Sequence, residues 1–328
     1  MTKIKTKIWP QPKVVVIGGG TGVSNLLYGL KRQTEDITAI ITVADDGGST
    51  GKLRNEYGII APGDIRACLI ALSNTQPIME DLLKYRFDRG DLEGHSFGNL
   101  FITAMHEITG SFEKSIKELS NVLSITGKVL PVTLADVTLV ARMADGTIVK
   151  GESKIPEEAM KRKTRIEEIW VEPELTYPLP DVLDEISQAD LIVLGPGSLY
   201  TSIIPNLLVD GIVEEIIRSK ARVVYVCNIM TQEGETEFYS VADHVKAIID
   251  HSDNIIDAVV INDRKIDKEY LRNYEEENQR QVALLDRDLA YLKKNNIEII
   301  KEDLIFIDEH NLIRHDCEKL SEKLISIL

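Results

Sequence analysis

A β-branched run that ends in a cluster of glycines is the feature that most constrains the fold of this chain. Residues 14–17 read Val-Val-Val-Ile, and residues 18–22 read Gly-Gly-Gly-Thr-Gly. An uninterrupted β-branched run is typical of a strand that is buried on both faces of a parallel sheet. Glycines directly after such a strand let backbone N–H groups approach a phosphate closely. The run therefore predicts an α/β fold with a nucleotide-type site at the end of its first strand.

Strand-like and helix-like segments alternate along most of the chain. Strands are predicted at residues 13–17 and 37–43, and a helix predicted at 22–32 gives them the spacing of a βαβ unit. Residues 64–123 show a mostly helical pattern. Alternation then resumes with helices expected at 182–187, 212–219, 240–250 and 317–328, and strands at 191–194, 222–227, 258–261, 297–301 and 304–307. This order predicts a doubly wound, mostly parallel sheet with added helices.

The stretch from about 124 to 175 departs from this alternation and is β-rich in character. Asp145-Gly146, between two extended runs, is a hairpin signal. The sequence shows no internal repeat, low-complexity linker or sharp compositional boundary. We therefore expect one elaborated domain over residues 1–328, with the β-rich stretch as an insertion within it.

Composition argues against several classes of protein. The formal net charge of −15 over 328 residues opposes binding to a nucleic-acid backbone. The three cysteines are scattered, which is typical of reduced thiols in the cytoplasm and not of a disulfide framework or a zinc site. No apolar run predicts a membrane span, and the first eleven residues lack the apolar core of a signal peptide. We expect a cytoplasmic protein.

The glycine run matches neither of two common nucleotide-binding motifs. Val23 stands where the dinucleotide fingerprint G-x-G-x-x-G would carry its third glycine, and no Gly-Lys-Ser/Thr of a Walker A loop follows. A structural turn without a ligand is therefore an alternative for this run taken alone. The same departure disfavours an oxidoreductase that uses NAD.

Two adjacent carboxylates, Asp45 and Asp46, follow the second predicted strand. Crowded carboxylates on a loop are typical of a site for a cation or a hydroxyl-rich ligand, or of a helix N-cap. Lys52 and Arg54 would then be available to neutralise a phosphate. Ser49 either joins this site or, with the threonine after it, caps a helix that begins at Lys52.

Two further polar clusters lie at the starts of predicted helices. Asp64 is expected to cap a helix, and Arg66 would lie in the first turn, where a cation is unfavourable unless it meets an anion. His95 is a candidate proton carrier. Ser96 and Asn99 either contact a ligand or cap the apolar helix that follows them.

Two later loops follow predicted strands, so they should meet the first glycine run at the carboxyl edge of the sheet. The loop after residue 194 offers Gly197, Ser198 and Thr201 to a phosphate. The loop after residue 226 offers Asn228 and Thr231 to a base or a sugar. Together with the glycine run, these segments predict one ligand site.

Six segments, taken in order, resemble the YvcK-like gluconeogenesis factors of bacteria, which belong to the superfamily of the 2-phospho-L-lactate transferase, CofD. The segments are residues 18–22, 44–51, 62–66, 94–100, 195–206 and 227–236. The resemblance extends from about residue 13 to residues 314–316 and so covers nearly the whole chain. It implies a Rossmann-like core with extra helices and strands.

The resemblance also implies a function. It implies a regulatory protein of the cytoplasm that binds a nucleotide-sugar such as UDP-N-acetylglucosamine and is needed for cell shape and wall synthesis on gluconeogenic carbon sources. A regulatory or wall-synthesis protein would be its partner, and a homodimer is a further expectation. No firm cofactor follows from the resemblance, and magnesium enters only if the chain is an enzyme.

The alternative is a magnesium-dependent transferase of the 2-phospho-L-lactate type that acts on a nucleotide-activated substrate. Its catalytic residues would be Asp45, Asp46, Arg66 and His95, with Asp45 and Asp46 as metal ligands. In the transferase branch, a carboxylate of the loop that matches Asp45-Asp46 helps to hold the deazaflavin substrate. Residues 47–51 here read Gly-Gly-Ser-Thr-Gly, which fits the gluconeogenesis-factor branch better.

For the binding protein, the predicted ligand-binding residues come from all six segments. They are Gly19, Gly20, Thr21, Gly22, Asp45, Asp46, Ser49, Lys52, Arg54, Asp64, Arg66, Ser96, Asn99, Gly197, Ser198, Thr201, Asn228 and Thr231.

Overall fold

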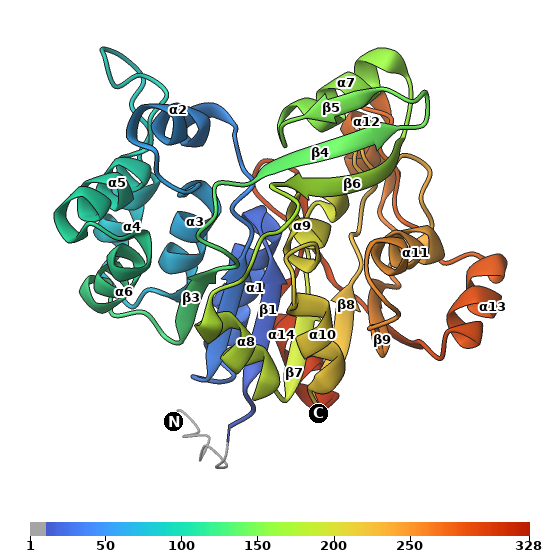
Figure 1. The fold of residues 1–328 in the computed structure, drawn as a ribbon. Coiled ribbons are helices and arrows are strands. Elements are labelled where there is room, and N and C mark those ends of the chain that lie inside the picture. Colours follow the sequence, from blue (N-terminus) through green and yellow to red (C-terminus); the bar gives the residue numbers. More distant parts are fainter. Residues whose placement is uncertain (1–10) are drawn as a thin grey trace.

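A seven-stranded parallel sheet forms the centre of the molecule in the computed structural model, which describes residues 11–328. The strand order is β10-β9-β8-β7-β1-β2-β3, and every neighbouring pair is parallel (Figure 1). The strands are β1 (Val14–Gly18), β2 (Ile37–Ile41), β3 (Lys128–Pro131), β7 (Leu191–Leu194), β8 (Arg222–Val226), β9 (Ala258–Asn262) and β10 (Glu298–Glu302). All residues of β1, β2 and β7 are buried, as the β-branched runs predict.

Helices cover both faces of this sheet, which confirms the doubly wound α/β fold. On one face α1 (Gly20–Leu30) packs against α3 (Gly63–Leu72) and α14 (Cys317–Ser326). On the other face α8 (Pro180–Ser187) packs against α10 (Ile212–Arg218) (Figure 1). A π-helical turn at Leu199–Ile203 and the short α9 (Ile204–Leu207) follow β7, and α11 (Val241–His251) and α13 (Asp286–Lys294) pack together beside β9 and β10. None of the helices within residues 11–328 is long and apolar enough to cross a membrane.

A block of helices lies beside β3 (Figure 1). It contains α2 (Gly48–Tyr57), α4 (Pro77–Lys84), α5 (Phe97–Thr109) and α6 (Phe112–Val122). Two predicted caps are wrong here. The helix α2 begins at Gly48 behind an uncapped Gly47, so Ser49 lies inside it. The helix α3 has Pro62 at its N-cap, which places Asp64 within the first turn.

The β-rich stretch divides between two sheets. Its first strand, β3, pairs with β2 at the edge of the main sheet. The other strands, β4 (Thr138–Met143), β5 (Ile148–Lys150) and β6 (Ile166–Glu172), form a separate antiparallel sheet with α7 (Lys154–Arg162). Figure 1 shows this small sheet above the carboxyl ends of the main strands. The predicted hairpin is confirmed, because the turn at Asp145-Gly146 joins β4 to β5.

The start of α7 is anchored to two loops of the main domain core. The backbone N–H of Ser153 donates to Asp46 Oδ1 at 2.9 Å. On the other side, a Cβ added to Gly234 would lie 2.5 Å from the Pro156 carbonyl oxygen, so the two backbones are in direct contact. The small sheet is therefore fixed in place by the end of α7 that faces the main sheet.

A hairpin near the C-terminus forms a second, smaller hydrophobic core. Its strands are β11 (Ile305–Ile307) and β12 (Ile313–His315), and α12 (Lys268–Glu276) packs on it. The sequence predicts the first of these strands but not the second, which is only three residues long. The buried members of this core are Ile229, Ile266, Ile305 and Ile313.

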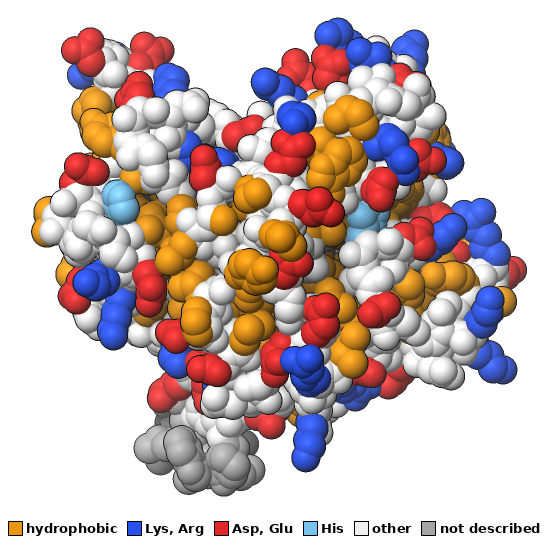
Figure 2. Space-filling model, viewed as in Figure 1, with side chains coloured by type: hydrophobic (Ala, Val, Ile, Leu, Met, Phe, Trp, Pro, Cys, Tyr) orange, Lys and Arg blue, Asp and Glu red, His pale blue; other side chains and the backbone are white. Residues whose placement is uncertain are grey.

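Charged side chains of both signs are interspersed over the face shown in Figure 2, and no extended basic patch is visible there. This pattern agrees with the acidic net charge of the chain.

One buried carboxylate connects three elements at the amino edge of the sheet, and its removal is expected to weaken the fold. Glu185 accepts hydrogen bonds from Lys128 (2.6 Å) and Thr38 (2.7 Å), and Lys13 Nζ lies 3.0 Å away. Burial alone would raise the Glu185 pKa, but these contacts hold it below its ordinary value. Glu185→Gln should lower the unfolding free energy by about 2 kcal/mol at neutral pH.

Urea unfolding of this variant over a range of pH provides the measurement. A carboxyl with a depressed pKa stabilises the folded state above its ordinary pKa, so the difference from wild type should disappear as the pH falls below the ordinary value of 4.5. Glu214→Gln, on the exposed face of α10, is the matched control. An equal loss in both variants would contradict the assignment.

Candidate functional site

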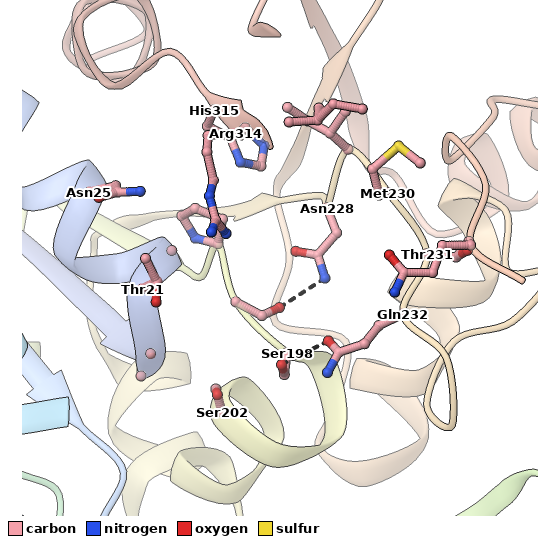
Figure 3. Close-up of a pocket in the computed structure, with 18 of the residues that line it drawn as sticks. Thr21, Asn25, Ser198, Ser202, Asn228, Met230, Thr231, Gln232, Arg314 and His315 are labelled. Atoms are coloured by element: carbon pink, nitrogen blue, oxygen red, sulfur yellow. Dashed lines mark hydrogen bonds between the residues drawn. The ribbon is translucent and has the colours of Figure 1, made fainter. Parts of the chain in front are cut away.

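A cavity of about 430 Å³ opens at the carboxyl ends of β1, β7 and β8, and we call it the main cavity because of this position. Loops after all three strands contribute to its wall, as open parallel sheets generally arrange their ligand sites. Figure 3 shows Thr21, Ser198, Asn228 and Arg314 converging on it from different segments. Its lining residues are Gly19, Gly20, Thr21, Gly22, Asn25, Pro196, Gly197, Ser198, Ser202, Asn228, Ile229, Met230, Thr231, Gln232, Tyr274, Gln279, Ile313, Arg314 and His315.

Two glycine loops in close contact form one side of the main cavity. A Cβ added to Gly22 would lie 2.4 Å from the Pro196 carbonyl oxygen, and one added to Gly197 would lie 3.1 Å from the Gly19 carbonyl oxygen. Gly19, the N-cap residue of α1, has no side chain to cap the helix, and the Asp64 carboxylate meets the N–H of Gly20, the first residue of α1. The other N–H groups of the first turn and the partial positive charge of the helix terminus favour an anion at this side.

A chain of polar side chains supports the second glycine loop from behind. Asn228 Nδ2 donates to the Gly197 carbonyl (2.9 Å), and Ser198 Oγ donates to Gln232 Oε1 (2.8 Å) (Figure 3). Gln232 in turn donates to the buried Glu235 (2.9 Å), which also accepts from Thr201 Oγ1 (3.1 Å). Burial raises the pKa of Glu235 to about 7, against the opposing effect of these donors. Thr201 therefore acts behind the loop and does not line the cavity.

The opposite side of the main cavity comes from the hairpin core. Arg314 points into the cavity between Thr21 and Asn228 (Figure 3). Among the described residues that line this cavity, it is the one lysine or arginine. His315 Nε2 lies 3.2 Å from the Cys227 carbonyl oxygen, and burial lowers the His315 pKa to about 4. The imidazole is therefore neutral at pH 7 and donates through Nε2 to that carbonyl.

A second cavity, of about 340 Å³, adjoins the first, and Gly20 and Thr21 line both. The other walls of this second cavity come from the loop after β2, from the starts of α2, α3 and α5, and from the segment between α4 and α5. They are Asp45, Gly47, Gly48, Ser49, Thr50, Gly63, Asp64, Arg66, Ala67, Arg86 and Asn99.

The two adjacent carboxylates after β2 have different surroundings: one lines the second cavity, and the other contacts the start of α7. Asp45 lines the second cavity and accepts the Gly47 N–H through Oδ1 at 2.9 Å. Asp46 instead accepts the Ser153 N–H and so anchors α7. Asp64 joins Asp45 in the second cavity. Burial and the nearby Asp45 raise the Asp64 pKa to about 6, although the Gly20 N–H and Arg66 oppose the shift.

Four other predicted site residues lie outside both cavity walls. Arg54 donates to the backbone carbonyls of Asp45 and Val137, both at 2.8 Å, so it holds two loops together. Ser96 caps α5, as one of the two alternatives for it predicts. His95 lies with its Nδ1 3.2 Å from Ser49 Oγ, and Lys52 is exposed on α2.

The structure thus brings thirteen of the predicted ligand-binding residues to the two cavities. The main cavity takes Gly19, Gly20, Thr21, Gly22, Gly197, Ser198, Asn228 and Thr231, and the second takes Asp45, Ser49, Asp64, Arg66 and Asn99. Asp46, Lys52, Arg54, Ser96 and Thr201 line neither.

Sequence reasoning missed the residues that the hairpin core contributes. Arg314 and His315 lie on a strand too short to give a periodic signal, and Tyr274 and Gln279 belong to a segment whose composition predicts an exposed helix. The available signal was the charged triplet at residues 314–316, to which the family resemblance extends.

The carboxylates of the second cavity could contribute to a magnesium site. Within residues 11–328, no group of three or more His, Cys, Asp or Glu side chains is arranged to hold a metal. Asp45 and Asp64 face one cavity and would offer two carboxylates, a number that magnesium accepts when substrate phosphates and water complete its shell. Asp46, bonded to Ser153, is turned away from them.

The raised pKa of Asp64 makes the stability of the fold depend on pH. The ordinary aspartate value is 3.8, so the folded state holds this proton more tightly than the unfolded state does. The free energy of unfolding should therefore fall as the pH rises from about 4 to about 6. Above about pH 6, Asp64 should contribute no further change. Asp64→Asn should flatten this part of the profile in thermal unfolding. Asp81→Asn, exposed on α4, is the control, and an identical profile for wild type and Asp64→Asn would refute the assignment.

Comparison with known proteins shows the family. The profile of the 2-phospho-L-lactate transferase CofD family matches residues 14–305. A protein named gluconeogenesis factor from Bacillus subtilis is 50% identical over 320 residues, which cover 97% of this chain and 98% of that protein. A gluconeogenesis factor from Halalkalibacterium halodurans is 46% identical and covers 95% of each chain.

A solved structure gives the same result. The crystal structure of a UPF0052 family member from Bacillus halodurans has a TM-score of 0.91 at 45% identity, and it covers 95% of this chain and 99% of that chain. Fold, motifs and sequence identity agree over nearly the full length. The chain belongs to the CofD family and, within it, to the gluconeogenesis factors.

Proposed function

We propose that this protein is a regulatory protein that binds a nucleotide-sugar of the UDP-N-acetylglucosamine class in the main cavity. The observation that carries the proposal is the pairing of the glycine-rich start of α1 with Arg314 across one cavity at the carboxyl edge of the sheet. A helix N-terminus and an arginine are two groups that proteins use to bind a diphosphate.

The remaining walls suit the other parts of such a ligand. Asn228, Thr231 and Gln232 offer amide and hydroxyl groups to a base or a sugar. Tyr274 and Met230 add apolar surface against which a ring can pack. The cavity volume of about 430 Å³ lies in the usual range for small-molecule sites.

The proposed role is regulation of cell shape and wall synthesis in the cytoplasm during growth on gluconeogenic carbon sources. The relatives named gluconeogenesis factors support the link to carbon source. A protein of wall synthesis or of its regulation would be the partner, and it would distinguish the ligand-bound protein from the free one.

Thermal stabilisation tests the ligand class. Purified protein is heated with UDP-N-acetylglucosamine, UDP-glucose, GDP or NAD, each with and without magnesium, because a ligand that binds only the folded state raises the melting temperature. The expected result is a rise with the UDP-sugars that does not require magnesium. No rise with either UDP-sugar would refute the proposal.

Arg314→Gln should weaken UDP-N-acetylglucosamine binding about 10- to 100-fold, because it removes a charge-assisted contact to the diphosphate. Isothermal titration calorimetry gives the dissociation constant. Arg272→Gln, an exposed arginine on the neighbouring α12 that lies outside the cavity wall, is the matched control. Equal affinities for the two variants would rule out Arg314 as the phosphate ligand.

A magnesium-dependent transferase is the second candidate. It is favoured by the match to the CofD profile and by Asp45 and Asp64 in one cavity next to the glycine loop. Magnesium there would stabilise developing charge on a transferred phosphoryl-linked group. Under this alternative, Asp45→Asn should abolish turnover of a nucleotide-activated substrate while leaving nucleotide binding in the main cavity intact. Binding by wild type without detectable turnover would favour the regulator.

A further inference from the structure

The second cavity contains two arginines without a carboxylate partner. Arg66 and Arg86 both line it. Within residues 11–328, neither guanidinium has an Asp or Glu oxygen within the 4.0 Å of an ion pair, whereas Arg54 and Arg142, for example, each have one. Burial and the neighbouring Arg86 lower the pKa of Arg66, while the more distant charges of Asp64 and Asp45 oppose that shift.

The surroundings of Arg66 leave part of its guanidinium unsatisfied. Its Nη1 donates to the Ser96 hydroxyl and to Asn99 Oδ1 (3.0 Å). Its Nε is buried and has no hydrogen-bond partner. A buried N–H of a cation without an acceptor is costly, so an anion in the adjoining cavity would stabilise it.

Local structure places the second guanidinium beside the first. Arg86 is bridged to Ser96 in an antiparallel pair, and its Nη1 donates to the Gly94 carbonyl. Because Ser96 also accepts from Arg66, both arginines are anchored around the same serine. The segment from 85 to 96 is thus folded back so that Arg86 reaches the cavity from the outside.

The rest of the second cavity has two parts, one lined by neutral donors and the other by carboxylates. Near the start of α2 it offers the hydroxyls of Ser49 and Thr50 and backbone N–H groups that no side chain caps. Asp45 and Asp64 line its wall at the loop side, where they are acceptors for hydroxyl groups. A ligand that suits both parts carries an anionic group and hydroxyls.

We propose that the second cavity is a separate binding site for a small phosphate ester that also carries hydroxyl groups. The phosphate lies between Arg66 and Arg86, where its oxygens accept from the guanidinium groups and balance their charge. The hydroxyls donate to Asp45 and Asp64. The two carboxylates repel the phosphate, so they also orient the molecule with its phosphate toward the arginines. This site does not depend on what the main cavity binds.

Calorimetric titration at constant ionic strength tests the proposal with three probes: inorganic phosphate, glycerol 3-phosphate and glycerol. We expect both phosphates to bind, glycerol 3-phosphate more tightly, and glycerol alone not to bind. Arg86→Gln should weaken phosphate binding at least tenfold. Arg86 is exposed, so this variant should fold normally, which its melting temperature checks.

Arg89→Gln is the matched control, since Arg89 is an exposed arginine of the same segment that lies outside the cavity wall. It should bind phosphate as the wild type does. Equal weakening in both variants would show a general charge effect and overturn the proposal, as would the absence of phosphate binding to the wild type.

A competition experiment separates this site from the main cavity. Saturating UDP-N-acetylglucosamine should leave the stoichiometry of glycerol 3-phosphate binding unchanged. Displacement of the phosphate would show that one ligand fills both cavities and would overturn a separate site. Because the phosphate titration is also made without any nucleotide-sugar, failure of the proposed function leaves this test intact. Conversely, Arg314→Gln should change only the nucleotide-sugar affinity.

Discussion

The backbone contact between two glycine loops is the constraint on which the rest of the site depends. The start of α1 and the loop after β7 approach so closely that a Cβ on Gly22 would collide with the Pro196 carbonyl oxygen. Parallel pairing of β1 with β7 brings the two loops to one edge, and the absence of side chains lets them touch. All other walls, from Asn228 to Arg314, are arranged around this contact.

Charge then distinguishes the two cavities that meet at this contact. The main cavity has one cation, Arg314, opposite a helix N-terminus, and a histidine that stays neutral. The second cavity holds two arginines and two carboxylates with no ion pair between them within the described part of the chain. The first arrangement suits one polyphosphate chain, whereas the second suits a smaller molecule with distinct ends.

The sequence predicts the parts that local pattern determines and misses those that depend on tertiary contacts. Runs of apolar and β-branched residues give β1, β2 and β7, and the two glycine loops directly follow β1 and β7. Asp45 and Asp46 look equivalent in the sequence, and only the position of α7 separates their roles. The contribution of β12 could not be predicted, since three residues of strand acquire their place from a separate hydrophobic core.

The hydrogen bond from His315 to the Cys227 carbonyl restricts the orientation of a ligand in the main cavity. With its proton on Nε2, the ring keeps only a lone pair on Nδ1, so it accepts a hydrogen and repels an oxygen anion. Arg314, the adjacent residue, has the opposite preference. Neighbouring positions on one strand thus favour opposite ligand groups: Arg314 favours a phosphate oxygen, and His315 favours an N–H or O–H donor. A ligand with a phosphate at one end and such a donor at the other fits in a single orientation.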